Sequence, residues 1–240
     1  THTLPVALPI FGFLSYTPVL KSHIYRSLAL LPVIEKVDPE IKWHQDVVSI
    51  IKEATHVLLI YKEFLNFQDD NALFNRAKDL SNLSGSSVIF EKPLKVETED
   101  PKSLLAINER FSILIELLTK YIETETSYPV NIPLGQALCL ADVACLINTR
   151  FLAYKRDIFD PELRNMVKTS IGFCHESVSE FLLNLPEVYG KTLTVHLKNT
   201  LALLETLLPF ANRKLDLEAV KSSEPLMCQL LACATSWMRL

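Results

Sequence analysis

Residues 104–121 read LLAINERFSILIELLTKY, and this stretch decides the fold class. Its apolar side chains recur every three or four residues, at Leu104, Ile107, Phe111, Leu114, Leu118 and Tyr121. Its polar side chains lie largely away from that face: Glu109, Ser112, Glu116 and Lys120. The spacing is typical of an amphipathic α-helix, because side chains three or four positions apart share one side of a helix.

Three more stretches have the same period. They span residues 47–65, 163–185 and 193–208, and none shows the sustained alternation of a strand. Aspartate–proline pairs precede three periodic segments, at Asp38-Pro39, Asp100-Pro101 and Asp160-Pro161. Aspartate can accept hydrogen bonds from the free N–H groups of a first helical turn, and proline suits the first helical position. The sequence therefore predicts an all-α protein with helices that start at these pairs.

The three pairs are roughly 60 residues apart, which leaves room for two helices and two connectors in each unit. HEAT and armadillo repeats use roughly 40–47 residues for each unit. We therefore expect an irregular α-solenoid of stacked helical hairpins, HEAT/armadillo-like, with a single globular helical domain as the alternative. A lone hairpin could not cover its apolar face, so neighbouring hairpins must stack.

The polar stretch 68–103 divides the chain. We expect first helical hairpins in 1–67, a partly mobile polar linker with a candidate short helix at Ala72–Leu80 in 68–103, and a second group of stacked helices in 104–240. These parts would form one continuous solenoid. The chain starts at Thr1 without a methionine, which suggests a fragment of a longer chain.

Composition excludes several classes of protein. Hydrophobic residues make up 49% of the 240 residues, which excludes a disordered tail, and only five are glycine, which argues against glycine-rich phosphate loops. The net charge of −4 does not favour bulk attraction to nucleic acid or anionic membranes. The apolar stretch 4–14 is shorter than the ~20 residues that a membrane span needs.

The cysteines are interpreted as reduced core residues of a cytosolic or nuclear protein rather than a disulfide framework: Cys139, Cys145, Cys174, Cys228 and Cys233.

Sequence motifs of enzymes are mostly missing. The pair His175-Glu176 begins like a zinc-binding H-E-x-x-H, but Ser179 occupies the position of the second histidine. Cys174 and His175 are adjacent on a predicted helix, so they point about 100° apart and cannot pair as nucleophile and base unaided. We predict no catalytic residue, no metal site and no cofactor.

Two surfaces are candidates for binding partners. A basic group surrounds the turn before Asp160 and is either a solvated helix edge or a contact for RNA or an acidic partner: Arg150, Lys155, Arg156, Arg164 and Lys168. The second candidate is the strip Tyr128–Gly135, which holds Pro129, Val130, Ile132, Pro133 and Leu134. Its prolines favour an ordered, extended connector between two helices, with the apolar residues on one face. That face either seals the protein's own helical stack or helps to dock a partner.

The order of these segments resembles a known family. The features are an apolar, proline-framed segment at 88–94, the helix INERFSILIELLTKYI at 107–122, the strip YPVNIPLGQAL at 128–138 and a helix pair in 141–183. Together they resemble the helical N-terminal region of the PELP-type pre-rRNA-processing scaffold family, the central subunit of the rixosome. Pro129-Val130, two residues, then Pro133-Leu134-Gly135 is the most specific part. Residues 41–67, with Trp43, look similar more loosely.

The resemblance implies a nuclear, non-catalytic scaffold for pre-rRNA spacer processing and assembly of the large (60S) ribosomal subunit. Its implied partners are a WD-repeat propeller protein, a second helical-repeat protein, and, through the complex, the midasin AAA ATPase and pre-60S particles. A link to heterochromatin is also implied. From the residues themselves we expect weak or absent direct RNA contact and no membrane. The alternative is a helical-repeat transport or coat adaptor unrelated to ribosome assembly, and a third hypothesis is a helical enzyme built on Cys174, His175 and Glu176.

Overall fold

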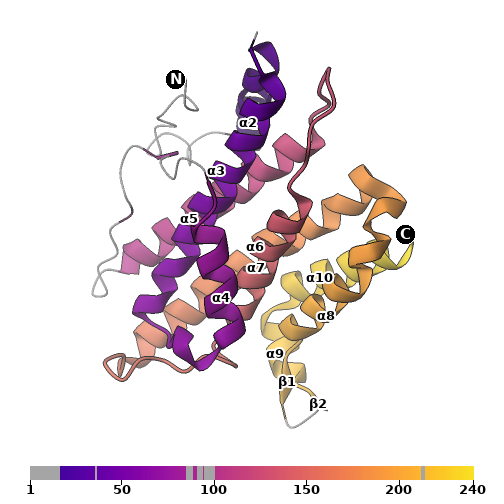
Figure 1. Cartoon of the computed structure of the whole chain (residues 1–240). Helices are drawn as coiled ribbons and strands as arrows, with labels where there is room; N and C mark the ends of the chain where they lie inside the picture. The colour runs from indigo at the N-terminus through magenta and orange to yellow at the C-terminus, as the bar shows by residue number, and fades with distance from the viewer. Residues whose placement is uncertain (1–16, 36, 85–88, 91–93, 95–100, 212–213) are drawn as a thin grey trace.

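The computed structural model describes residues 17–35, 37–84, 89–90, 94, 101–211 and 214–240 (Figure 1). Helices account for most of these residues. The α-helices are α2 (Pro18–Ile34), α3 (Pro39–Leu59), α4 (Asn71–Ser81), α5 (Pro101–Glu123), α6 (Leu134–Leu146), α7 (Pro161–Tyr189), α8 (Leu197–Leu207), α9 (Leu217–Ser222) and α10 (Glu224–Met238). Three 3₁₀ turns, η1 (Ile60–Glu63), η2 (Phe67–Asp69) and η3 (Gly190–His196), and two short strands, β1 (Phe210–Ala211) and β2 (Lys214–Leu215), complete the order.

The long helices pack in two rows. In one row α2 packs on α5, α5 on α7, and α7 on α10. In the other row α3 and α4 pack on α6, and α6 packs on α8 (Figure 1). The rows contact each other through α3 with α5, α6 with α7, and α8 with α10. This arrangement confirms the predicted irregular α-solenoid; counted by order along the chain, α2/α3, α5/α6 and α7/α8 are successive units.

The aspartate–proline pairs mark helix starts, although they do so by different means. Asp160 caps α7 as expected, because its carboxylate accepts a hydrogen bond from the Glu162 N–H at 3.0 Å. Asp38 precedes α3 in a left-handed conformation (φ 46°, ψ 51°), and its side chain makes no capping bond. Its backbone carbonyl instead accepts bonds from Ile41 and Lys42, each at 3.1 Å. Pro101 begins α5, whereas Asp100 lies outside the described residues.

Two periodic stretches are not continuous α-helices. In the stretch 47–65, the α-helix α3 ends at Leu59 and the chain continues as η1. In the stretch 193–208, η3 comes first and α8 begins at Leu197. Gly190, with φ +51°, ends α7 in a conformation that favours glycine. Leu193 is nevertheless fully buried, because a 3₁₀ turn also places every third residue on one side. The strand pair β1/β2 was not predicted, since each strand has only two residues.

The polar stretch 68–103 contains α4 where a short helix was expected. Leu73, Ala77 and Leu80 are buried against the core, and α4 packs on α3 and α6. Ile89 and Phe90 are buried too, so the stretch is not an exposed linker along its whole length. The three-part division of the chain stays a prediction, and 85–88, 91–93 and 95–100 lie outside the described residues.

Buried hydrogen bonds join helices of different units. The Tyr61 hydroxyl in η1 lies 2.6 Å from Ser170 Oγ of α7 and 3.1 Å from Asn108 Oδ1 of α5. Trp237 of α10 donates its indole N–H to the Leu182 carbonyl of α7 at 2.7 Å. Two loops also pair, because the Asn66 N–H bonds to the Ala153 carbonyl and the Lys155 N–H to the Phe64 carbonyl, both at 2.9 Å. None of the helices in the described residues has the length and hydrophobicity to cross a membrane.

Candidate interaction surfaces

The strip between α5 and α6 is an irregular connector, and α6 begins at Leu134 with Gly135 as its second residue. Val130, Ile132 and Leu134 are half-buried and pack against the hydrophobic core, whereas Pro129 and Asn131 are exposed. His44 Nδ1 of α3 lies 2.9 Å from the Asn131 carbonyl, which fixes the strip to the neighbouring unit. The alternation predicted from the sequence is present, and its apolar side faces the protein itself.

The basic group predicted from the sequence does not form one continuous patch. The Arg150 guanidinium donates to the Leu208 and Thr206 carbonyls at the end of α8. Arg164 donates from Nε to the Ile158 carbonyl at 2.8 Å and lies over the Tyr154 ring. Both arginines therefore stabilise the protein's own loops and helix ends.

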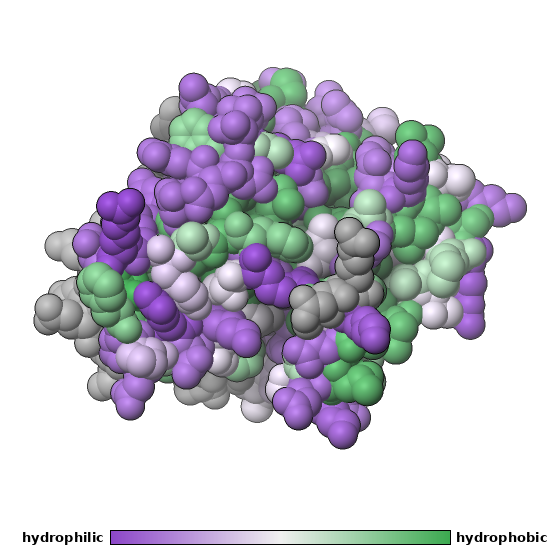
Figure 2. Space-filling model, turned by 90° about the horizontal axis from the view of Figure 1, so that it is seen from below, coloured by the Kyte–Doolittle hydropathy of each residue, from purple (hydrophilic) through white to green (hydrophobic). Residues whose placement is uncertain are grey.

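The remaining members of this group lie at the surface. Lys155 Nζ is 3.8 Å from the Glu63 carboxylate, while Arg156 and Lys168 are exposed. Phe151 and Phe159, on the same loop, are 55% and 77% exposed. Seen from the lower end of the molecule, hydrophilic and hydrophobic residues appear in separate small areas rather than in one large patch (Figure 2). Of the five predicted side chains, Arg156 and Lys168 are therefore the ones most available to a partner.

The side chains of Cys174, His175 and Glu176 contact different neighbours. The Cys174 thiol is buried near the Tyr61 hydroxyl, and burial raises its pKa to about 12. His175 is also buried, and its Nε2 lies 3.2 Å from the Ala144 carbonyl and 3.1 Å from the Ile147 carbonyl, at the end of α6. Burial lowers the His175 pKa to about 4. Glu176 lines a groove over α5 and α7, and together with His175 it also lines a cavity of about 810 Å³ that reaches Arg150 and Lys168. The two side chains are neighbours on α7 but point toward different partners, so the Cys174 thiol and the His175 imidazole do not pair as nucleophile and base.

The cysteines are free thiols, as expected, but they are not all core residues. Cys145, Cys174 and Cys233 are buried, Cys139 is half-buried and Cys228 is exposed on α10. Among the residues that the structure describes, no three histidine, cysteine, aspartate or glutamate side chains are grouped to hold a metal ion.

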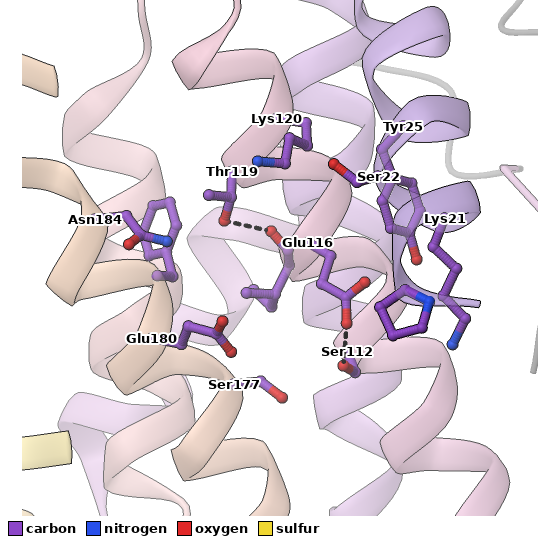
Figure 3. A pocket seen from close by; sticks show the side chains of 13 residues that line it. Lys21, Ser22, Tyr25, Ser112, Glu116, Thr119, Lys120, Ser177, Glu180 and Asn184 are labelled. Atoms are coloured by element: carbon purple, nitrogen blue, oxygen red, sulfur yellow. Dashed lines mark hydrogen bonds between the residues drawn. The ribbon is translucent and has the colours of Figure 1, made fainter. Parts of the chain in front are cut away.

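A groove crosses the surface of the row α2, α5 and α7, and sequence reasoning missed it. Figure 3 shows Glu116 of α5 and Glu180 of α7 on opposite sides of it, with Lys21 and Tyr25 of α2 alongside. The cavity holds about 350 Å³. Ser112 donates to the Glu116 carboxylate at 3.1 Å. The signal in the sequence was weak: Glu109 and Glu116 lie seven residues apart, and Glu176 and Glu180 four apart, each pair on one helical face.

Comparisons with known proteins give related sequences from fungi. The chain is 36% identical over 234 residues to the pre-rRNA-processing protein RIX1 of Debaryomyces hansenii, covering 95% of this chain and 31% of that protein. It is 37% identical over 237 residues to RIX1 of Scheffersomyces stipitis (97% of this chain, 32% of the relative). RIX1 of Saccharomyces cerevisiae is 26% identical over 196 residues, covering 78% of this chain and 25% of that protein. The chain thus spans about a third or less of the length of these relatives. No protein-family model matches it.

A solved structure shares the fold. A chain of the Rix1 subcomplex in a Rix1-Rea1 pre-60S particle matches with a TM-score of 0.75, covering 95% of this chain and 39% of that one. The two sequences are 21% identical, so this likeness supports the helical architecture alone. The names of the relatives agree with the pre-rRNA-processing part of the resemblance, whereas membership of a PELP-type family stays a prediction.

Proposed function

We propose, from the similarity to the RIX1 pre-rRNA-processing proteins, that this chain is a non-catalytic scaffold region for pre-rRNA spacer processing and large (60S) subunit assembly in the nucleus. One observation carries the proposal: the sequence match extends over 95–97% of the chain at 36–37% identity in two yeasts. A match of that extent includes both rows of helices and the loops between them, so it is not confined to one motif.

The proposed partners are a WD-repeat propeller protein, a second helical-repeat protein, the midasin AAA ATPase and pre-60S particles. The last two are supported by the relatives' name RIX1, because a Rix1 subcomplex is part of a pre-60S particle that also holds Rea1, a midasin. The propeller, the second helical-repeat protein and a link to heterochromatin rest on the family resemblance alone.

The surroundings of the candidate catalytic residues support a non-catalytic role. Cys174 and His175 are buried in neutral form on different sides of α7, and each is explained by a packing contact. An extended two-row solenoid instead offers long surfaces, which suits a protein that holds others together.

For partner contacts we propose the strip and the two exposed basic side chains Arg156 and Lys168. In the strip, Pro129 and Asn131 face outward, while Val130 and Ile132 hold it against the core. Arg156 in the loop before α7 and Lys168 on α7 would meet acidic side chains rather than RNA, because Asp157 and Asp160 lie between them in the sequence and would repel phosphate.

A chimera tests the proposed function. The segment of the Candida albicans relative that matches this chain, 29% of that protein, would be replaced by residues 1–240. We expect the chimera to restore pre-rRNA spacer processing and the normal ratio of 60S to 40S subunits, and to co-purify with a WD-repeat protein. The matched control is the same protein with the segment deleted. A chimera that is made at normal level and folded, yet behaves like the deletion, would contradict the proposal.

A further inference from the structure

The groove over α2, α5 and α7 is longer than the one cavity that Figure 3 shows. A second cavity of about 410 Å³ adjoins it, and the two share Lys21, Ser112, Glu116, Ser177 and Glu180. The second cavity extends past Glu109 of α5 and Glu176 of α7 to Gln229 of α10. We call this continuous surface the acidic groove, because four glutamates line it: Glu109, Glu116, Glu176 and Glu180.

The floor of the acidic groove is apolar. Ile115 and Phe181 line one end and Ile113 the other, and all three are buried side chains of the α5–α7 seam. Phe173, at the second end, is 47% exposed. A large aromatic ring that is half in water at the edge of a groove can bury more surface when a partner covers it.

The charges in the groove are not balanced within the described part of the chain. None of its four glutamates forms an ion pair there. Two lysines line the groove, and one of them, Lys120, pairs with Glu123 at 2.5 Å. Glu176 and Glu180 are four residues apart on one helix, where like charges repel and destabilise the helix. A cationic ligand would remove that repulsion.

We propose that the acidic groove binds a basic, amphipathic helical segment of a partner protein, with its lysines or arginines on the glutamates and its apolar side chains on the floor. Helical segments present both kinds of side chain at the spacing that a groove between helices requires. RNA and anionic lipid carry the same sign of charge as the groove, so they are disfavoured. The proposal concerns the chemistry of this surface and holds whether or not the chain serves ribosome assembly.

A peptide-binding assay tests it. The probe is a fluorescein-labelled helical peptide of about four turns, with leucines on one side and lysines on the other. The groove variant is Glu116→Gln/Glu180→Gln. The control variant, Glu187→Gln/Glu205→Gln, changes the net charge by the same amount at exposed positions outside the groove.

We expect fluorescence anisotropy at low salt to show that the unmodified protein binds the peptide. The groove variant should weaken the affinity for the peptide at least about fivefold, and the control variant less than about twofold. The groove variant should melt close to the unmodified protein, because it loses repulsion between carboxylates while a glutamine oxygen can still accept the Ser112 hydrogen bond that Glu116 accepts. Equal weakening by both variants would overturn the proposal, since it would show attraction to net charge alone. The proposal would also be overturned if a peptide with glutamate in place of lysine bound equally well, or if the lysine peptide did not bind.

Discussion

Acid should destabilise this protein through one buried side chain, His175. Its Nε2 lies close to two carbonyls at the end of α6, so the neutral imidazole must donate its Nε2 hydrogen to them. Burial lowers the pKa from 6.5 to about 4, so the folded state resists protonation that the unfolded state accepts. The contribution of this group to stability is therefore fully present above pH 6.5 and is lost as the pH falls through about 4.

The magnitude follows from the two pKa values. At 1.36 kcal/mol for each pKa unit, a difference between 6.5 and about 4 amounts to about 3 kcal/mol at and below pH 4. At pH 5 the unfolded state is almost fully protonated at this group and the folded state is not, so about 2 kcal/mol is already lost. Two other buried groups act in the opposite direction. Burial raises the pKa of Asp46 to about 6 and that of Glu53 to about 7, so their contributions fall as pH rises toward these values.

Asp46 and Glu53 titrate in the same pH range as His175, so a single curve of stability against pH would mix their effects. The assay therefore compares the unmodified protein with variants at two pH values. Urea unfolding at pH 5.0 and pH 7.5 would give the difference in unfolding free energy between the unmodified protein and His175→Gln. We expect that difference to shrink by about 2 kcal/mol at pH 5.0, since glutamine does not titrate. Ser170→Ala, which removes a buried hydroxyl from the same helix, should cost the same at both pH values. A His175→Gln cost that does not depend on pH would refute the reasoning.

Three further predictions concern stability. Asp160→Ala should cost about 1 kcal/mol of unfolding free energy in urea, because α7 loses its cap, whereas the exposed Asp157→Ala should change little. Trp237→Phe keeps the aromatic packing on α7 but loses the bond to the Leu182 carbonyl, and we expect a cost of about 1–2 kcal/mol by the same assay. Val130→Ser/Ile132→Ser should lower the melting temperature, because both side chains pack on the core; unchanged melting with loss of a co-purifying partner would instead support docking by this face.

The sequence predicted most of the architecture because helical periodicity is a local property. The face through Leu104, Phe111 and Leu118 is buried as predicted, and Asp160 caps α7. The sequence analysis failed where the same residue pair can begin a helix in two ways. Asp38 has the same proline neighbour as Asp160, yet it adopts a left-handed conformation and leaves its carboxylate unused as a cap.

The candidate sites were harder to predict, because they depend on contacts between distant parts of the chain. Arg150 looked available for a partner, but its guanidinium reaches carbonyls 56 and 58 residues further on. The glutamates of the acidic groove come from α5 and α7, and the groove is completed by α2 and α10, which only the packed structure places beside them. The Arg150 contact leaves no pattern in the sequence, and the spacing of the glutamates does not show which helices pack together, so both features required coordinates.

The hydrogen bonds around Tyr61 have a consequence for how this solenoid unfolds. In a linear array each unit touches only its neighbours, so the ends can fray independently. Here the Tyr61 hydroxyl in η1, which follows α3, lies 2.6 Å from Ser170 Oγ of α7, two units further along the chain. Backbone hydrogen bonds at Asn66 and Lys155 also join the segment after α3 to the loop before α7. The first and third units are therefore joined directly by hydrogen bonds. We expect their amide hydrogens to exchange with solvent as one cooperative block, at the rate of global opening rather than in sequence from one end.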